Sequence, residues 1–171
     1  MIFLGIGSNL DSKYGSRISN LNKIINLLQL EKIEIVKISS VYESPSYPNK
    51  KNPKFLNICL QIESNHKPEI LMKIFKNIEK KMQRKKEKKN YPRTCDIDII
   101  DYNGKLIKSK DLIIPHPRAH LRNFVLFPLY EIAKKWIHPI FNKKIEFLIN
   151  ELKLNLKNEI TKIKESVIIN K

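Results

Sequence analysis

The sequence predicts an α+β fold with the ferredoxin-like order β-α-β-β-α-β, in which an antiparallel sheet carries helices on one face and C-terminal additions follow. Two patterns support this prediction. Residues 55–64 alternate between apolar and polar side chains, as a strand with one buried face does. Residues 68–82 instead repeat apolar side chains at helical spacing, after a proline that suits the first helical turn. We therefore expect the second face of the sheet to remain available for ligands.

The other elements follow from local patterns along the chain. β-branched residues are frequent over 32–43 and predict one long strand there. The apolar run at 124–133 predicts a buried helix. In chain order, we expect strands over 2–7, over 32–43, over 55–64, from Asp96 to the Asn103-Gly104 turn, and over 111–116. We expect helices over 16–30, 68–82, 124–133 and 144–152.

The length of 171 residues suits one domain over 1–171, with the Lys- and Asn-rich tail 153–171 interpreted as a frayed helix. No apolar run approaches the length of a membrane-spanning helix, and the N-terminus lacks the basic segment of a signal peptide. Cys59 and Cys95 have no metal-ligand spacing and are interpreted as reduced thiols in or near the core. We expect a cytoplasmic protein with no membrane partner.

The net charge of +16 is large enough to raise the question of nucleic-acid binding. However, only five of the 33 basic residues are arginines, and the lysines are spread along the whole chain. Because asparagine and isoleucine are also abundant, we interpret the charge as a drift in composition. We expect no nucleic-acid partner and a monomer, while a small anionic substrate would still be attracted by this charge.

The clearest chemical signal is the pair of aspartates in the stretch YPRTCDIDII at 91–100. In a strand, Asp96 and Asp98 point to one face and the isoleucines between them to the other. Neighbouring carboxylates repel unless a cation lies between them, and Mg²⁺ commonly binds one or two carboxylates together with substrate phosphates. Arg93 suits a pair of phosphate oxygens. The alternative is an exposed strand face with two solvated aspartates.

Five stretches of the chain carry further motifs: Gly7 to Leu10, Ser39 to Pro45, Pro53 to Asn57, Pro92 to Ile100, and Ile114-Pro115-His116 together with Arg122-Asn123-Phe124 and Pro128-Leu129. In this order and spacing they resemble the 6-hydroxymethyl-7,8-dihydropterin pyrophosphokinase family of folate biosynthesis. The resemblance covers roughly residues 2–150 and implies an ATP-dependent diphosphotransferase. Such an enzyme transfers pyrophosphate from ATP to the pterin hydroxymethyl group and releases AMP.

The resemblance also implies residue roles. Asp96 and Asp98 would hold two Mg²⁺ ions and, with Arg84 and Arg93, form the catalytic set. ATP would contact Arg84, Lys86, Arg93, Ile99, His116 and Arg122. The pterin would contact Ser44, Pro45, Tyr47, Phe55, Asn57 and Phe124.

The chemistry of these residues is consistent with the roles that the resemblance implies, although a structural role is an alternative for several of them. A flat heteroaromatic ring needs apolar surfaces, which Phe55 and Phe124 supply, and polar groups at its rim, which Asn57 supplies. The alternative for the two phenylalanines is plain core packing, and for His116 a histidine that only caps a loop. Lys86 would replace a family arginine and lose its two-pronged contact.

The chain departs from the family pattern just before Pro92. An aromatic residue and a glycine are usual there, whereas this chain has Asn90 and Tyr91, and a basic nucleotide contact is replaced by Asp111. We hypothesise that Tyr91 takes over the stacking role of the missing aromatic residue; the alternative is an exposed tyrosine without a role. Glu79 resembles a family helix residue, but the pattern assigns it no function.

Two other functions are alternatives to the pyrophosphokinase interpretation. One is a different two-metal nucleotidyl- or phosphotransferase, although such enzymes place Gly-Ser and Asp-x-Asp on neighbouring elements. The other is a basic RNA-binding module of ferredoxin-like fold, which should carry aromatic residues on its middle strands. The strand at 55–64 has only Phe55.

Overall fold

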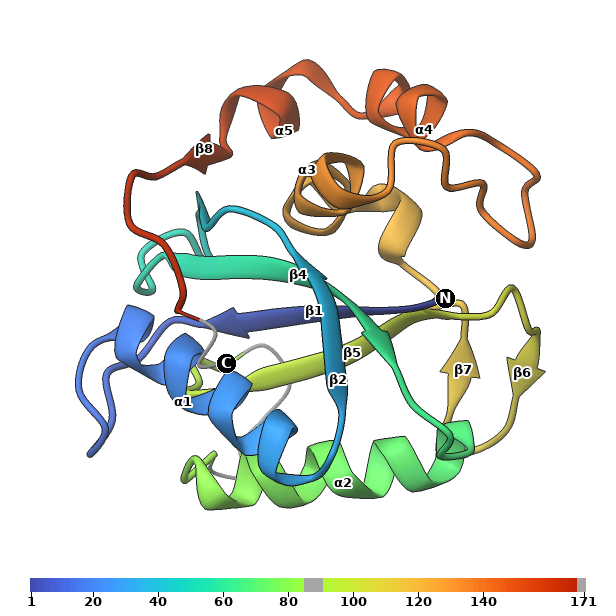
Figure 1. Ribbon diagram of the computed structural model, residues 1–171. Coiled ribbons are helices and arrows are strands. Elements are labelled where there is room, and N and C mark those ends of the chain that lie inside the picture. The colour runs from blue at the N-terminus through green and yellow to red at the C-terminus, as the bar shows by residue number, and fades with distance from the viewer. Residues whose placement is uncertain (85–90, 169–171) are drawn as a thin grey trace.

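The computed structural model describes residues 1–84 and 91–168, and a six-stranded antiparallel sheet lies at its centre (Figure 1). The strand order is β5 (Asp96–Tyr102), β1 (Ile2–Ser8), β4 (Phe55–Glu63), β3 (Tyr42–Ser44) and β8 (Thr161–Lys162), and β2 (Glu34–Ile38) also pairs with β4. Strands β1 to β5 and helices α1 and α2 follow the predicted α+β, ferredoxin-like scheme, with β2 and β3 in the place of its second strand, and this prediction is confirmed.

Two helices, α1 (Arg17–Leu30) and α2 (Pro68–Lys81), cover one face of this sheet (Figure 1). The Ser16 hydroxyl caps α1 by accepting a hydrogen bond from the Ser19 amide at 3.4 Å, and Pro68 occupies the first turn of α2 as expected. The apolar stripe of α2, represented by Phe75, packs with the inward-facing isoleucines and leucines of β1 and β4 to form the main core.

The second face of the sheet is only partly open. Helices α3 (Asn123–Ile132) and α4 (Ile145–Glu151) pack there against Phe3, Cys59 and Ile100. The Trp136 indole adds a hydrogen bond to the Asp101 carboxylate at 2.8 Å. As a result β4 is buried on both faces, and the prediction that it is half-exposed is wrong, because the C-terminal helices cover its polar side. The uncovered part of this face contains the pocket described below.

The strand expected over 32–43 is divided into β2 and β3. At the break, the Ser39 amide still donates to the Cys59 carbonyl at 3.0 Å, while the Ser39 hydroxyl accepts from the Cys59 amide at 2.9 Å. Ser40 turns towards α3 and donates its hydroxyl hydrogen to Glu131 at 2.7 Å. Serine side chains compete with strand pairing in this way, so a β-branched run alone did not predict the break.

The region after β5 is less regular than expected. The strand predicted over 111–116 is reduced to β7 (Ile113–Ile114), which pairs with β6 (Ile107–Lys108). The His116 amide nevertheless donates to the Ile100 carbonyl at 2.9 Å, which ties this segment to β5. A short 3₁₀ helix, Ala119–Leu121, then leads into α3.

The tail differs from the frayed helix that we expected. It forms the five-residue helix α5 (Leu154–Asn158) and then the strand β8, which joins the sheet beside β3 (Figure 1). Both cysteines are free and buried, with Cys95 just ahead of β5 rather than inside it. Within the two described ranges, no helix has the length and apolar character needed to cross a membrane.

Candidate active site

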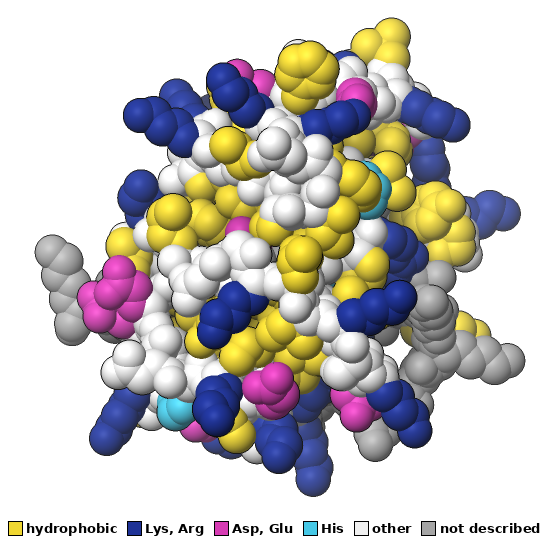
Figure 2. All heavy atoms as spheres, turned by 90° about the vertical axis from the view of Figure 1, so that its right-hand side faces the viewer, with side chains coloured by type: hydrophobic (Ala, Val, Ile, Leu, Met, Phe, Trp, Pro, Cys, Tyr) yellow, Lys and Arg dark blue, Asp and Glu magenta, His cyan; other side chains and the backbone are white. Residues whose placement is uncertain are grey.

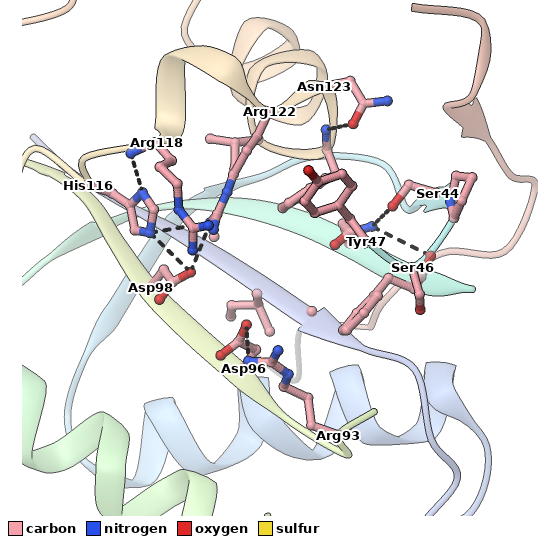
Figure 3. Close-up of a pocket in the computed structure, with 18 of the residues that line it drawn as sticks. Ser44, Ser46, Tyr47, Arg93, Asp96, Asp98, His116, Arg118, Arg122 and Asn123 are labelled. Carbon is pink, nitrogen blue, oxygen red and sulfur yellow. Dashed lines mark hydrogen bonds and ion pairs between the residues drawn. The ribbon is translucent and has the colours of Figure 1, made fainter. Parts of the chain in front are cut away.

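The side chains predicted for the site gather around one pocket of about 600 Å³ on the uncovered part of the sheet. The two aspartates of β5 lie towards one end, near His116 and Arg122, while Ser44, Ser46 and Tyr47 lie towards the other (Figure 3). The predicted residues that line it are Ser44, Pro45, Tyr47, Phe55, Asn57, Arg84, Arg93, Asp96, Asp98, His116, Arg122 and Phe124. The structure therefore brings together residues from five separate stretches of the chain, and their individual roles stay predictions.

The floor of the pocket exists because β1 carries two glycines opposite the aspartates. Gly5 pairs with Asp98 and Gly7 pairs with Asp96 across the β1–β5 ladder. A methyl group added to Gly7 would lie 3.2 Å from the Asn57 carboxamide oxygen. A side chain at position 7 would therefore take up pocket space beside Asn57. The two glycines were a signal for this site that sequence reasoning did not use.

The Asp-x-Asp alternation is confirmed. Ile97 and Ile99 are 1% and 3% exposed and pack in the main core, so Asp96 and Asp98 project from the opposite side into the pocket. This separation follows directly from the two-residue period of a strand. It also means that Ile99, which was expected to contact ATP, has its side chain in the core and does not line the pocket. Only its main chain is left for a nucleotide contact.

Asp96 is held by two arginines. Arg84 Nη1 lies 2.7 Å from Asp96 Oδ1, and Arg93 Nη1 lies 3.1 Å from Asp96 Oδ2. Because these charged hydrogen bonds engage both oxygens, they fix the plane of the carboxylate. Arg93 also lies over the Phe55 ring, with its guanidinium carbon 5.9 Å from the ring centroid. The cationic and aromatic parts of the pocket are thus in direct contact.

Asp98 lies in a different electrostatic setting. Its nearest cationic group is Arg122, whose Nη1 is 3.6 Å from Asp98 Oδ2. Burial, followed by the Asp96 charge, raises the pKa of Asp98 to about 6, and Arg122 opposes this shift. Two carboxylates that repel in this way suit a divalent cation, whose charge would favour the ionised form of both.

The donor set fits Mg²⁺. Carboxylate oxygens are the ligands that this ion prefers, and it commonly keeps positions for water and phosphate oxygens. Within residues 1–84 and 91–168, no three His, Cys, Asp or Glu side chains gather as a metal-binding group. An ion held by Asp96 and Asp98 would therefore retain open positions for oxygen atoms of a substrate.

His116 is neutral in this pocket. Burial and the charges of Arg122 and Arg118 lower its pKa to about 4. Its Nδ1 accepts a hydrogen bond from the Arg118 amide at 3.1 Å. Its Nε2 lies 3.3 Å from Arg122 Nη1 and 3.8 Å from Asp98 Oδ2. His116 therefore contributes an uncharged imidazole between Arg122 and the anionic part of the pocket.

The other end of the pocket combines aromatic surface with polar groups. Phe55 and Phe124 are both half-buried on its wall, so neither is simply a core residue. Asn57 is 5% exposed and donates to the Ser44 hydroxyl at 3.0 Å, which orients its carboxamide. Tyr47 lies at the rim and is 74% exposed. This end can accept a flat ring between apolar faces with hydrogen-bonding groups at its edge.

Sequence reasoning missed the function of Glu79. This carboxylate is 4% exposed, accepts from the Ile97 amide at 3.1 Å and forms an ion pair with Arg84. Arg84 is therefore clamped between Glu79 and Asp96. The signal was available, because an acidic residue at position 79 interrupts the core-facing stripe of α2 beside Ile78. Further lining residues that the sequence did not single out are Ser46, Lys50, Lys76, Arg118, Leu121, Leu156 and Glu159.

The predictions for the segment before Pro92 have different outcomes. Tyr91 is 48% exposed and lines the pocket, where its carbonyl accepts from Arg93 Nε at 3.3 Å. Its proposed stacking role stays a prediction. Lys86, expected to contact ATP, lies outside the described residues, as does Asn90.

Comparisons with known proteins identify the family of this chain. A family model described as 7,8-dihydro-6-hydroxymethylpterin-pyrophosphokinase matches residues 3–134. The 2-amino-4-hydroxy-6-hydroxymethyldihydropteridine pyrophosphokinase of Aquifex aeolicus is 40% identical over 145 residues, which cover 85% of this chain and 88% of that protein. The protein of the same name from Bacillus subtilis is 34% identical over 134 residues, 78% of each chain.

Longer proteins match as well. Folic acid synthesis protein FOL1 of Dictyostelium discoideum is 38% identical over 159 residues, which are 92% of this chain but 23% of that protein. A crystal structure of Plasmodium falciparum HPPK-DHPS has a TM-score of 0.72 at 15% identity, and the match covers 95% of this chain and 46% of that one. That likeness supports the fold alone. From the family match and the identity to the relatives of similar length, the chain belongs to the 7,8-dihydro-6-hydroxymethylpterin-pyrophosphokinase family.

Proposed function

We propose that this protein transfers the pyrophosphoryl group of ATP to the hydroxymethyl group of 6-hydroxymethyl-7,8-dihydropterin in folate biosynthesis, with release of AMP. Membership of the family and the names of the relatives support this activity. The observation that carries it is the shape of the pocket, in which paired carboxylates and arginines face an aromatic, amide-bearing end within about 600 Å³. A polyanion and a flat heterocycle would therefore bind side by side.

The anionic end is suited to the triphosphate of ATP. Asp96 and Asp98 would hold two Mg²⁺ ions, which neutralise charge on the transferred group when they are bound. Arg84 and Arg93 keep Asp96 in a fixed orientation at 2.7 and 3.1 Å and present their remaining N–H groups to the pocket. Arg122 adds a further cation, and neutral His116 lines the same end of the pocket without adding charge.

The aromatic end is suited to the pterin. Phe55 and Phe124 would contact the faces of the ring, while Asn57 and Ser44 would recognise the polar groups at its edge. Because Phe55 also contacts Arg93, the ring and the triphosphate would be held next to each other. Such positioning provides much of the catalysis in this chemistry, since it converts a reaction between two bound substrates into a unimolecular step.

The transfer itself is a displacement at phosphorus. The oxygen of the pterin hydroxymethyl group forms a bond to the β-phosphorus of ATP, the bond from that phosphorus to the bridging α,β-oxygen breaks, and AMP leaves. The hydroxyl proton is released during the reaction. Residues of this chain contribute by alignment and by charge, which are the main contributions of proteins to phosphoryl transfer.

An end-point assay tests the proposal. The protein is incubated with ATP, Mg²⁺ and the hydroxymethyl-dihydropterin, and the nucleotide products are separated. We expect AMP and the pyrophosphorylated pterin to form in equal amounts. ADP would indicate an ordinary kinase instead, and free pyrophosphate with a nucleotidylated pterin would indicate a nucleotidyltransferase. Absence of turnover in the presence of both substrates would contradict the proposal.

The RNA-binding alternative receives little support. On the face drawn in Figure 2, the Lys and Arg side chains are scattered among apolar and acidic patches rather than gathered in one stripe. Salt-dependent retention on RNA would still reveal it. A monomeric, cytoplasmic protein remains our expectation, which size-exclusion chromatography and fractionation can check.

A further inference from the structure

A part of the chain outside the family match forms a wall of the pocket. The family model ends at residue 134, whereas Leu156 and Glu159 of the tail both line the pocket. Helix α5 contributes Leu156, and Glu159 lies between α5 and β8. The tail therefore has a place in the site that the family motifs did not indicate.

The tail is attached to the strand that leads into the pterin end. Strand β8 pairs with β3 at Tyr42 and Glu43, and the Ile163 amide donates to the Val41 carbonyl at 3.0 Å. Lys162 Nζ lies 3.2 Å from the Glu131 carboxylate, which also accepts the Tyr42 hydroxyl hydrogen at 2.9 Å. Since β3 ends at Ser44, these contacts fix the start of the loop that carries Pro45 and Tyr47.

Two side chains connect the tail to the pterin end itself. Asn123 donates from Nδ2 to the Leu156 carbonyl at 2.5 Å and accepts from the Phe124 amide at 2.7 Å, so one buried carboxamide joins the tail to the aromatic wall. On the other side, Glu159 lies 2.5 Å from Lys50 Nζ in the 45–53 loop. The aromatic wall and the loop are thus each linked to the same ten-residue segment, 154–163.

We propose that residues 154–163 are a fixed wall of the pterin end, and that Asn123 and Glu159 act as positioning residues that set the affinity for the pterin rather than for ATP. This inference rests on the proposed function. A loop that is ordered before binding loses less conformational entropy when the ligand binds, so its affinity is higher. The Lys50–Glu159 pair is partly exposed and stabilises the whole protein little, so its effect should appear in binding rather than in unfolding.

A charge-exchange series in the full chain tests the loop contact. Glu159→Lys and Lys50→Glu should each weaken pterin binding by roughly fivefold or more, because each frees the loop to adopt other conformations. The double variant, with both charges exchanged, should recover most of the loss. Binding is measured from pterin fluorescence in the presence of a non-hydrolysable ATP analogue, and affinity for the analogue is measured in parallel.

The chain offers a matched control. Glu151 forms an ion pair with Lys143 in the same C-terminal region, where its side chain is 48% exposed, against 25% for Glu159, and does not line the pocket. Glu151→Lys should leave the pterin affinity unchanged. If Glu159→Lys and Lys50→Glu bind pterin like the parent, or if they weaken the ATP analogue equally, the inference is wrong.

The strand contact is tested by a second pair. Ile163→Pro removes the amide that donates to Val41, whereas Ile163→Val keeps it. The proline variant should lose pterin affinity and raise KM for the pterin while kcat and KM for ATP stay within about twofold, a pattern that a general loss of folding does not produce. Equal effects on both substrates would overturn the proposal.

The outcomes also separate this inference from the proposed function. Failure of the parent protein to form AMP would count against the proposed function alone. Equal pterin affinity in the parent and all tail variants would count against the role of the tail, whatever the turnover.

Discussion

The Asn9 side-chain carboxamide oxygen accepts a hydrogen bond from the Arg93 backbone amide at 2.6 Å, and the Asn9 backbone amide donates one to the Arg93 carbonyl at 3.0 Å. The same carboxamide donates from Nδ2 to the Ser46 hydroxyl at 3.1 Å and to the Pro53 carbonyl at 3.0 Å. One buried asparagine after β1 therefore links the segment ahead of Asp96 to both ends of the 45–53 loop.

This relationship predicts that Asn9→Leu lowers both stability and turnover. The substitution leaves the Arg93 amide without its partner, which costs about 1–3 kcal/mol of unfolding free energy for a buried group. It also removes one of the two hydrogen bonds to the Pro53 carbonyl, which the Ser46 hydroxyl contacts as well. Asn9→Asp keeps the acceptor for Arg93 but loses the donor to the loop, so it should chiefly raise KM for the pterin. Urea unfolding and steady-state kinetics measure both effects, with Asn65→Ala on an exposed loop as the control. Parent-like kinetics in Asn9→Leu would contradict this role.

We predict that Asp98→Asn abolishes turnover without loss of stability. Burial and the Asp96 charge already disfavour the ionised Asp98 carboxylate, so a neutral amide removes a repulsion from the folded protein. The same substitution removes a proposed metal ligand, which affects turnover. Turnover should fall by roughly a hundredfold or more, as loss of metal-assisted charge neutralisation is worth several kcal/mol. Thermal unfolding should give a Tm equal to or above that of the parent.

Asp96→Asn should behave differently in stability although it too abolishes turnover. Arg84 and Arg93 would lose the charge that they contact at 2.7 and 3.1 Å, and the partly buried Arg84 would keep only Glu79. A lower Tm is therefore expected. The exposed Asp111→Asn serves as the control for both variants. Near-parent turnover of either active-site variant at saturating Mg²⁺ would rule out the assigned metal ligands.

Two substitutions distinguish a stacking role of Tyr91 from the alternative of an exposed tyrosine without a role. If the ring stacks on a bound ligand, Tyr91→Ala should weaken binding or slow turnover by about tenfold, or about 1.4 kcal/mol, while Tyr91→Trp is tolerated. Fluorescence titration and steady-state rates provide the measurement. The stacking hypothesis fails if Tyr91→Ala and Tyr91→Gly both match the parent.

The buried His138 predicts acid sensitivity of the fold. It is 1% exposed, Nδ1 accepts from the Ile140 amide at 3.2 Å, and Nε2 has no hydrogen-bond partner in the described part of the chain. Burial, and then the charge of His120, lower its pKa from 6.5 to about 4, against a smaller opposing effect of Asp101. The unfolded chain therefore binds more protons between these pH values, and stability falls as the pH falls from 6.5 to 4.

The size of this loss is on the order of 3 kcal/mol for His138 alone. Urea unfolding of the parent at pH 7.5 and pH 4.5 should show it, and His138→Gln should reduce the difference. His66→Gln, at a half-exposed position, is the control and should leave the difference unchanged. An identical pH dependence in His138→Gln and the parent would show that another group is responsible.

Local patterns were sufficient for several parts of the site. The order Asp96-Ile97-Asp98 predicted which side chains leave the sheet together, because the two-residue period of a strand is independent of context. The apolar repeat and Pro68 likewise predicted α2 within one residue of its observed end. The resemblance added the partners from distant stretches, and the structure brings these around one pocket.

Contacts that depend on tertiary packing could not be predicted from local sequence patterns. A periodic pattern specifies which face of an element is apolar but not what lies against it, so the covering of β4 by α3 and the pairing of β8 with β3 went unpredicted. Buried polar residues such as Glu79 and Asn9 gain their partners only when distant segments meet. The sequence by itself determined the strand, the carboxylate pair and the family. The tertiary structure decided how arginines are held around Asp96 and that residues of the tail line the pocket. The reason is that side-chain direction follows from local backbone geometry, whereas hydrogen-bond partners follow from long-range packing.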